Sequence, residues 1–287
     1  MAQPDFIIIG GTKCGTTSLT GYLDRHTDVY LAPKELRYFT KEHRWHLGED
    51  WYRRQFAEAG PNQIVGEASN AYTRDPVYAG AARRVHEALP EAKLIYLIRE
   101  PWARMASHYR HRMVTGREWR PANRALREEP SYLAVSQYGH QLSLYRKLFP
   151  KRQILVLSSE GLFREPKKEL SRLCGFLGIP FKDLPLEKEN ASADRRAVSS
   201  LLRPLARFPF LQPLLHRSRN LLPGDLSSEI AFSVTGATKQ LFNRKLNSDR
   251  RLLLSLIEED AVCWPYYDED LHSEPNPKLS PTLTQAV

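Results

Sequence analysis

Short apolar runs alternate with segments of helical periodicity along most of the chain. A short apolar run closed by glycine, proline or charge is typical of a buried parallel strand, whereas apolar residues three or four positions apart indicate a helix. The runs predicted as strands are residues 6–9, 29–31, 63–66, 92–98 and 153–157. The segments predicted as helices are 16–26, the second half of 43–59, 76–88, 101–112, 136–148, 166–177 and 250–261.

This alternation predicts an α/β fold with a central parallel sheet flanked by helices. The 287 residues suffice for one sizeable core, and no change in composition marks a boundary. We expect a single domain over residues 1–274 and a disordered, proline-rich tail over 275–287. Residues 190–223 lack a clean period, and the role of residues 190–237 is not indicated by any motif. Their leucines, at 201–222, are expected to pack in the core, with a lid or a lipid-binding surface as the alternative.

Charge and cysteine content limit the partners and the compartment. The net charge of +9 attracts polyanions such as a nucleotide, an acidic glycan or a nucleic acid, although a basic surface can also serve solubility alone. Cys14, Cys174 and Cys263 form neither a CxxC pattern nor a disulfide framework, which favours a reducing compartment. Since the sequence also shows no signal peptide or transmembrane span, we expect a cytoplasmic location.

The segment GGTKCGTT at residues 10–17 lies between the first predicted strand and the first predicted helix. Glycines five positions apart let backbone N–H groups turn inward and hold an anion at a helix N-terminus. The spacing is that of the first half of a P-loop, but the lysine stands upstream, at Lys13, and Thr16 and Thr17 follow the second glycine. The segment therefore predicts a phosphate loop, and a simple strand-to-helix turn is the alternative.

A second anion site is predicted at the end of the strand 92–98. P-loop enzymes that use ATP or GTP place a metal-binding acidic residue after such a strand, whereas here Arg99 follows it. Arginine binds anions in a bidentate manner and repels cations. Ser107, on the following helix, could reach the same phosphate group. Because an arginine stands where a metal-binding carboxylate would be needed, we expect a phosphate-bearing ligand and no metal. None of the nine histidines has a metal-ligand spacing either.

At these motifs the sequence resembles the sulfotransferase family that uses 3′-phosphoadenosine 5′-phosphosulfate (PAPS). The branch most similar contains the heparan sulfate N- and 3-O-sulfotransferases and many bacterial relatives. Residues 6–19 resemble its 5′-phosphosulfate loop, and residues 94–107 resemble its 3′-phosphate strand and helix. The segment KELRYF at 34–39 is similar to the one that carries a glutamate base. The likeness covers residues 5–180 well and the remainder loosely.

The resemblance implies a role for each matching residue. Lys13 would stabilise charge on the leaving phosphate, Glu35 would be the general base, and Arg99 with Ser107 would hold the 3′-phosphate. The remaining donor-site residues are Cys14, Gly15, Thr16, Thr17 and Ser18. For the Cys14 side chain we expect packing and no chemistry. The alternatives for the base are that Glu35 is a surface carboxylate between Lys34 and Arg37, or that a histidine serves.

The implied reaction is sulfuryl transfer to a hydroxyl or amine, with carbohydrate as the first acceptor and a lipid or small metabolite next. Ala68 stands where the heparan-modifying enzymes carry a lysine, so their acceptor recognition does not carry over. The two alternative functions are a P-loop kinase or NTPase, which would need an acidic metal ligand, and a basic nucleic-acid-binding module, which would show steeply salt-dependent binding.

A basic stretch follows the second anion site. We expect solvated helix and loop faces here, with His108 and His111 on the helix surface, and a grip on an acidic acceptor or nucleic acid as the alternative. The stretch contains the aromatic residues Tyr109 and Trp119 and the arginines Arg104, Arg110, Arg112, Arg117, Arg120, Arg124 and Arg127.

Overall fold

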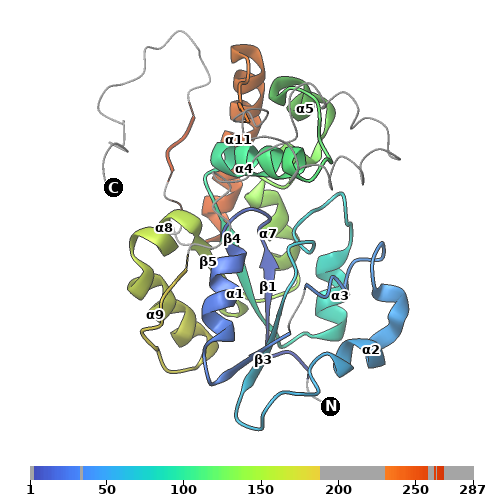
Figure 1. Cartoon of the computed structure of the whole chain (residues 1–287), viewed down its shortest axis with the longest axis vertical. Coiled ribbons are helices and arrows are strands. Elements are labelled where there is room, and N and C mark those ends of the chain that lie inside the picture. Colours follow the sequence, from blue (N-terminus) through green and yellow to red (C-terminus); the bar gives the residue numbers. More distant parts are fainter. Residues whose placement is uncertain (1–2, 33–34, 188–229, 258–261, 263, 268–287) are drawn as a thin grey trace, which may run out of the picture.

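A parallel five-stranded sheet forms the centre of the computed structural model, which describes residues 3–32, 35–187, 230–257, 262 and 264–267. The strand order is β2-β3-β1-β4-β5, and every neighbouring pair is parallel (Figure 1). The α/β fold predicted from the sequence is therefore confirmed. The strands are β1 (Phe6–Gly10), β2 (Val29–Leu31), β3 (Ile64–Ala68), β4 (Lys93–Ile98) and β5 (Ile154–Ser158).

The strand order places the predicted motifs at one edge of the sheet. From β1 the chain passes over β3 to reach β2, and after β3 it crosses β1 to reach β4. Connections therefore leave β1 and its neighbours in opposite directions, and ligands of open α/β sheets bind outside the carboxyl ends of the strands at such a point. The segments that follow β1, β3 and β4 all begin there.

Helices cover the sheet and its carboxyl edge. Figure 1 shows α1 crossing in front of the strands, and α4 and α5 lying above their carboxyl ends. The helices that pack around the sheet are α1 (Thr16–Asp24), α2 (Gly48–Arg54), α3 (Ala81–Ala88), α7 (Tyr138–Arg146), α8 (Ser159–Arg164) and α9 (Pro166–Leu177). The others are α4 (Pro101–Val114), α5 (Ala122–Glu128), α6 (Ser131–Ala134) and α11 (Gly236–Leu256), with 3₁₀ turns η1 (Trp45–Leu47) and η2 (Lys151–Gln153).

The apolar side chains divide into two clusters. The larger one contains all of β1 before its glycine and most of β4, which are buried on both faces as a central parallel sheet requires. The smaller one joins α4, α5, α6 and α11 through residues such as Met105, Leu126, Tyr132 and Phe242. The second cluster fixes α4 above the sheet edge, which is where Ser107 lies.

Several predicted boundaries were wrong. The last helix begins at Gly236 and not near 250, because its buried face includes the polar Asn247 and Asp249 and so hides the apolar period. The helix predicted from 76 begins at Ala81, after turns that end at Gly80 with a φ of 76°. The short helices α5, α6 and α8 were not predicted. The tail 275–287, the last four residues of the helix predicted over 250–261 (258–261) and the unpatterned leucines at 201–222 lie outside the described residues.

The expectation of solvated faces was wrong for part of the basic stretch. Arg104 is fully buried, and its guanidinium donates to Ser136 Oγ and to the Tyr132 carbonyl, each at 2.6 Å. His108 is 5 % exposed and packs against the Tyr132 ring. Both lie on the face of α4 that is covered by neighbouring segments, so the pKa of each is lowered, chiefly by burial. The solvated arginines are Arg117, Arg124 and Arg127.

Candidate functional site

The loop after β1 is held in an unusual backbone conformation. Gly10 has a φ of 149°, and a side chain there would meet Thr73 Oγ1 at 2.0 Å, so only glycine fits. Lys13 has a φ of 66°. Such a conformation costs a non-glycine residue about 1 kcal/mol or more and is enriched at functional sites. In the described part of the chain Lys13 shares this feature with one other non-glycine residue, Arg37, which lies two positions after Glu35.

Helix α1 presents its N-terminus to this loop. It begins at Thr16, directly after Gly15, whose φ of 91° turns the chain. Gly15 occupies the N-cap position and makes no side-chain hydrogen bond to the first turn of the helix. The N–H groups of the first turn, which have no partner within the helix, can therefore bind an anion. Thr16 and Ser18 are buried and Thr17 is exposed, so among these hydroxyls that of Thr17 faces outward.

Cys14 turns inward from the loop. Its N–H bonds the Gly11 carbonyl at 3.2 Å, and its sulfur lies 3.7 Å from the Tyr138 hydroxyl. Burial raises the pKa of the thiol to about 11. A thiol that stays protonated is a poor nucleophile, so the geometry agrees with the packing role expected for this side chain.

Arg99 lies against the phosphate loop. Its Nη1 donates to the Lys13 carbonyl at 3.3 Å, which joins the end of β4 to the end of β1. Glu160 lies nearby, where its carboxylate accepts the N–H of Glu100 at 2.9 Å and burial raises its pKa. Ser107 is 5 % exposed on α4, and within the described residues no hydrogen bond joins it to Arg99. The structure thus joins Arg99 to Lys13, whereas no hydrogen bond between the described residues joins Ser107 to Arg99.

Glu35 is held from both sides of its carboxylate. Oε1 accepts a hydrogen bond from Asn70 Nδ2 at 2.8 Å, and Oε2 accepts one from Arg37 Nε at 3.0 Å. The side chain remains 34 % exposed. Thr12 Oγ1 in turn donates to the Asn70 carbonyl at 3.2 Å. Glu35 is therefore connected through Asn70 to the same loop that carries Lys13.

Asn70 was missed by the sequence analysis. It follows the end of β3 closely, much as Arg99 follows β4, and polar residues at the carboxyl ends of neighbouring parallel strands were the signal available.

Glu67, on β3, is a buried carboxylate to which no role was assigned from the sequence. It accepts hydrogen bonds from the hydroxyls of Tyr52 at 2.8 Å, Tyr72 at 3.0 Å and Ser69 at 2.8 Å. Burial raises its pKa to about 7 against the pull of these donors. Ser69 Oγ accepts the Arg37 N–H at 2.9 Å. The network therefore fixes the segment from which Glu35 projects.

A pocket lies apart from this cluster. It has a volume of about 460 Å³ and lies against β5, between α7 and α9, and the candidate residues named above do not line it. Among the described residues, no group of three or more His, Cys, Asp or Glu side chains could hold a metal ion. No helix in the described part of the chain is long and apolar enough to cross a membrane.

A parallel sheet with a glycine-rich loop after β1, an arginine after β4 that contacts this loop and a carboxylate linked to the loop through Asn70 defines an open α/β protein with a polar cluster at the carboxyl edge of its sheet. Within that class the chain belongs to the sulfotransferase family, because the family model matches residues 4–183, more than half of the chain. The resemblance expected from the motifs is confirmed.

Known relatives agree with this assignment. Human heparan sulfate glucosamine 3-O-sulfotransferase 5 is 30 % identical over 190 residues, which cover 62 % of this chain and 54 % of that protein. Human heparan sulfate glucosamine 3-O-sulfotransferase 6 is 29 % identical over 187 residues, covering 61 % and 52 %. The chain thus spans about half the length of these relatives. The crystal structure of a sulfotransferase from Alicyclobacillus acidocaldarius superposes with a TM-score of 0.63 at 25 % identity, covering 90 % of this chain and 96 % of that one.

Proposed function

We propose that the protein transfers a sulfuryl group from PAPS to an acceptor hydroxyl or amine, most favourably on a carbohydrate. The observation that carries this proposal is the contact set that joins the phosphate loop to Arg99 on one side and, through Asn70, to Glu35 on the other. Family membership supports the sulfuryl transfer. The names of the heparan sulfate relatives support a carbohydrate acceptor.

The donor would lie along the carboxyl edge of the sheet. The N-terminus of α1 and Lys13 would bind the 5′-phosphosulfate, because the N–H groups at a helix N-terminus and an ammonium both favour an anion. Arg99 and Ser107 would bind the 3′-phosphate, and the planar guanidinium suits bidentate contact with phosphate oxygens.

Glu35 would act as the base for the acceptor. In the transfer step an acceptor oxygen or nitrogen forms a bond to sulfur while the bond from sulfur to the bridging phosphate oxygen breaks. The acceptor proton passes to Glu35, and the leaving phosphate takes the electron pair close to Lys13. Positioned cations and amides would supply most of the rate enhancement, since charge develops on the sulfuryl and bridging oxygens.

The test is transfer of radiolabelled sulfate from PAPS into a fractionated extract of the source cells. We expect Lys13→Ala to abolish labelling, and Glu35→Gln to lower turnover by roughly 10²- to 10⁴-fold with binding of 3′,5′-adenosine bisphosphate retained. Glu49→Gln is the matched control, because Glu49 also pairs with an arginine, Arg53, but on the exposed face of α2. Labelling that survived Lys13→Ala would refute the proposal, and full turnover in Glu35→Gln would refute the base.

A further inference from the structure

Arg74 is a partly buried arginine in the turns between β3 and α3, four residues after Asn70. Its guanidinium lies over the Tyr78 ring, 5.1 Å from the centroid. The Nε atom is buried, and within the described part of the chain it has no hydrogen-bond partner. No ion pair to a carboxylate is formed by Arg74 among those residues. An arginine left in this state is costly unless something else satisfies it, because guanidinium groups need both charge and hydrogen-bond partners.

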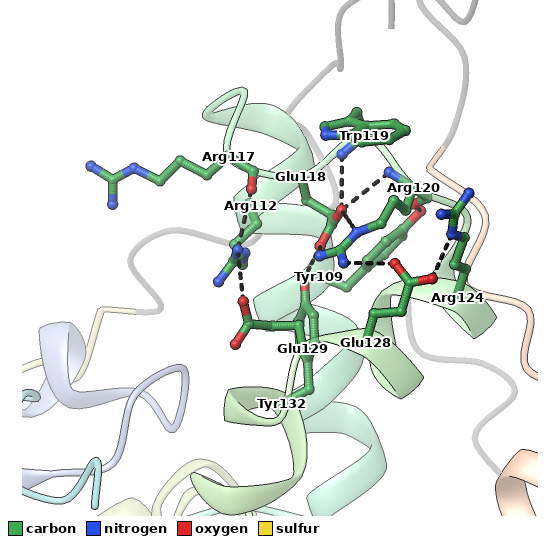
Figure 2. A network of polar contacts seen from close by, with 10 residues as sticks. All are labelled: Tyr109, Arg112, Arg117, Glu118, Trp119, Arg120, Arg124, Glu128, Glu129 and Tyr132. Carbon is green, nitrogen blue, oxygen red and sulfur yellow. Dashed lines mark hydrogen bonds and ion pairs between the residues drawn. The ribbon is translucent and has the colours of Figure 1, made fainter. Parts of the chain in front are cut away.

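Arg112 is in a similar state on α4. Figure 2 shows its guanidinium beside Glu129, with Nη2 3.4 Å from Glu129 Oε2 and 3.3 Å from the Arg117 carbonyl. These are long contacts for a charged pair. Its Nε is buried, again with no hydrogen-bond partner among the described residues, and its side chain is 21 % exposed. Arg112 thus has donors to spare beside the aromatic ring of Tyr132, which it faces at 5.5 Å.

Positive charge accumulates around Arg74. Burial is the main cause of its lowered pKa, and the charges of Arg37 and Arg112 act in the same direction. Burial is also the main cause of the lowered pKa of His108, followed by the charge of Arg104, and Arg74 and Arg112 act in the same direction. Glu129 is the carboxylate that opposes these charges at Arg74, and it already pairs with Arg112. Like charges that are brought together away from water call for a counter-anion.

This cluster borders the candidate base. Arg37, whose charge acts on Arg74, binds Glu35 through its Nε. A line of contacts also runs from Arg74 to Tyr78, from Tyr78 to the His43 ring at 5.0 Å, and from His43 through Thr40 to the Arg37 carbonyl. Arg74 is therefore on the Glu35 side of the site, whereas the predicted 3′-phosphate ligand Arg99 is attached to the phosphate loop.

We propose that Arg74 and Arg112 form an oxyanion subsite for the acceptor, so that the preferred acceptor carries a carboxylate or a sulfate ester close to the group that is sulfated. This inference rests on the proposed function, because it assumes that the acceptor reacts at Glu35. Arginine side chains suit both kinds of oxyanion through paired N–H donors, and a neutral acceptor would leave those donors unsatisfied.

The test is equilibrium binding of three matched sugars to the full chain, measured by calorimetry with and without saturating 3′,5′-adenosine bisphosphate. The sugars are 4-nitrophenyl β-glucuronide, 4-nitrophenyl β-glucoside 6-sulfate and the neutral 4-nitrophenyl β-glucoside. We expect at least one of the two anionic sugars to bind about tenfold or more tightly than the neutral one. The sugar that does so identifies whether a carboxylate or a sulfate ester is recognised.

Arginine variants test which residues cause the preference for an anionic sugar over the neutral one. Arg74→Gln and Arg112→Gln should each remove it while leaving binding of 3′,5′-adenosine bisphosphate unchanged. Arg83→Gln, which removes an exposed arginine paired only with Glu87 in the described structure, should keep it. Arg74→Lys, which keeps the charge, covers the case in which Arg74→Gln does not fold, and should retain part of the preference.

Four outcomes separate this inference from the proposed function. Equal binding of all three sugars, or a preference that survives both Arg74→Gln and Arg112→Gln, would overturn the subsite. Loss of nucleotide binding in Arg74→Gln would also overturn it, by assigning this arginine to the donor. A chain that fails to bind 3′,5′-adenosine bisphosphate at all would instead refute the proposed function, whatever the sugars do.

Discussion

Single residues decide how the base is presented. Asn70 contributes its side-chain amide to Glu35 and its backbone carbonyl to Thr12, so one residue links the acceptor side of the site to the phosphate loop. Lys13 and Arg37, on either side of that link, adopt left-handed backbone conformations. Strain of this kind persists where surrounding contacts enforce it. These contacts argue that Asn70 is a positioning residue for Glu35.

Replacing Asn70 tests this role. Asn70→Ala removes the donor 2.8 Å from Glu35 Oε1, and we expect kcat to fall about tenfold, as the loss of one hydrogen bond to a charged group would give. Asn70→Asp replaces the donor by a second carboxylate, which repels Glu35, so kcat should fall at least as far as in Asn70→Ala while binding of 3′,5′-adenosine bisphosphate is retained. Full activity in Asn70→Asp, or a fall in nucleotide affinity equal to the fall in kcat, would argue against positioning.

Glu67 gives a pH-dependent contribution to stability. Burial raises its pKa from 4.5 to about 7, so the folded state holds the proton more tightly than the unfolded chain. This contribution to the free energy of unfolding is complete below pH 4.5 and is lost as the pH rises through about 7. The contribution amounts to at most about 3 kcal/mol. Urea unfolding between pH 5 and 8 measures it.

Glu67→Gln is the matching variant. Its carbonyl can accept from Tyr52 and Tyr72, which share Oε1, while its amide can donate to Ser69. We expect the free energy of unfolding to fall less with rising pH in Glu67→Gln than in the parent chain. The comparison is needed because burial also raises the pKa of Asp249, to about 6, which gives the same sign. Parallel curves for the two proteins would contradict the assignment to Glu67.

At the level of elements, sequence reasoning was most successful where a segment is buried on both sides or has clear punctuation. The strands β1 and β4 are continuous apolar runs, and α9 begins at Pro166 and ends before Gly178, whose φ of 83° is the expected C-cap geometry. Helix α11 was cut short because Asn247 and Asp249 are buried for tertiary reasons. Their partners, residues 267 and 139–140, are distant in sequence and could not be inferred from local periodicity.

The residues of the candidate site could also be predicted only where the local sequence carries a clear signal. Lys13 and Arg99 could be found because each stands at a strand end within a recognisable motif. Arg104 and His108 were placed on the surface because charge normally indicates exposure, and only the packing of α6 against α4 reveals that they are buried. Asn70 and Glu67 act through contacts with residues from other segments, so their roles require the fold.

The close contact between α7 and α11 can be tested at Gly139. A methyl group there would meet the Asp249 carbonyl at 2.4 Å and the Leu253 nitrogen at 2.8 Å. Both are backbone atoms of a neighbouring helix, so relief requires the helices to separate, and we expect Gly139→Ala to destabilise the protein by about 2 kcal/mol or more. Gly175, inside α9, is the control, because an added methyl group meets nothing within 4 Å.

Thermal or urea unfolding of the two variants distinguishes packing from helix propensity. Gly175→Ala should stabilise the protein by up to about 1 kcal/mol, since alanine favours a helix over glycine. Gly139→Ala gains the same propensity within α7 and should nevertheless be destabilised. A stabilised Gly139→Ala variant would mean that α11 does not approach α7 as closely as the contact distances require.

At the scale of the whole molecule, the net charge of +9 is compatible with any polyanion, so charge alone does not choose between a nucleotide donor and nucleic acid. The topology is more selective, because it brings Lys13 and Arg99 together at one edge of the sheet, close to the α1 N-terminus. A compact anion with phosphates at two ends fits that arrangement better than an extended backbone. The cytoplasmic location remains a prediction from the sequence.

Ligand-induced stabilisation of the full chain tests this choice between polyanions. At 100 times its dissociation constant, 3′,5′-adenosine bisphosphate should raise the free energy of unfolding by about 2.7 kcal/mol. The effect should be unchanged by EDTA, because Arg99 occupies the strand end where an ATP-using P-loop enzyme places its metal-binding carboxylate. Adenosine 5′-monophosphate at the same concentration should stabilise much less, and Arg99→Gln should reduce the difference between the two nucleotides by removing a phosphate contact. Stronger stabilisation by ATP with magnesium would instead indicate a kinase. If a duplex DNA stabilised the chain more than either nucleotide did, and this effect fell steeply with salt, the protein would be a nucleic-acid-binding protein.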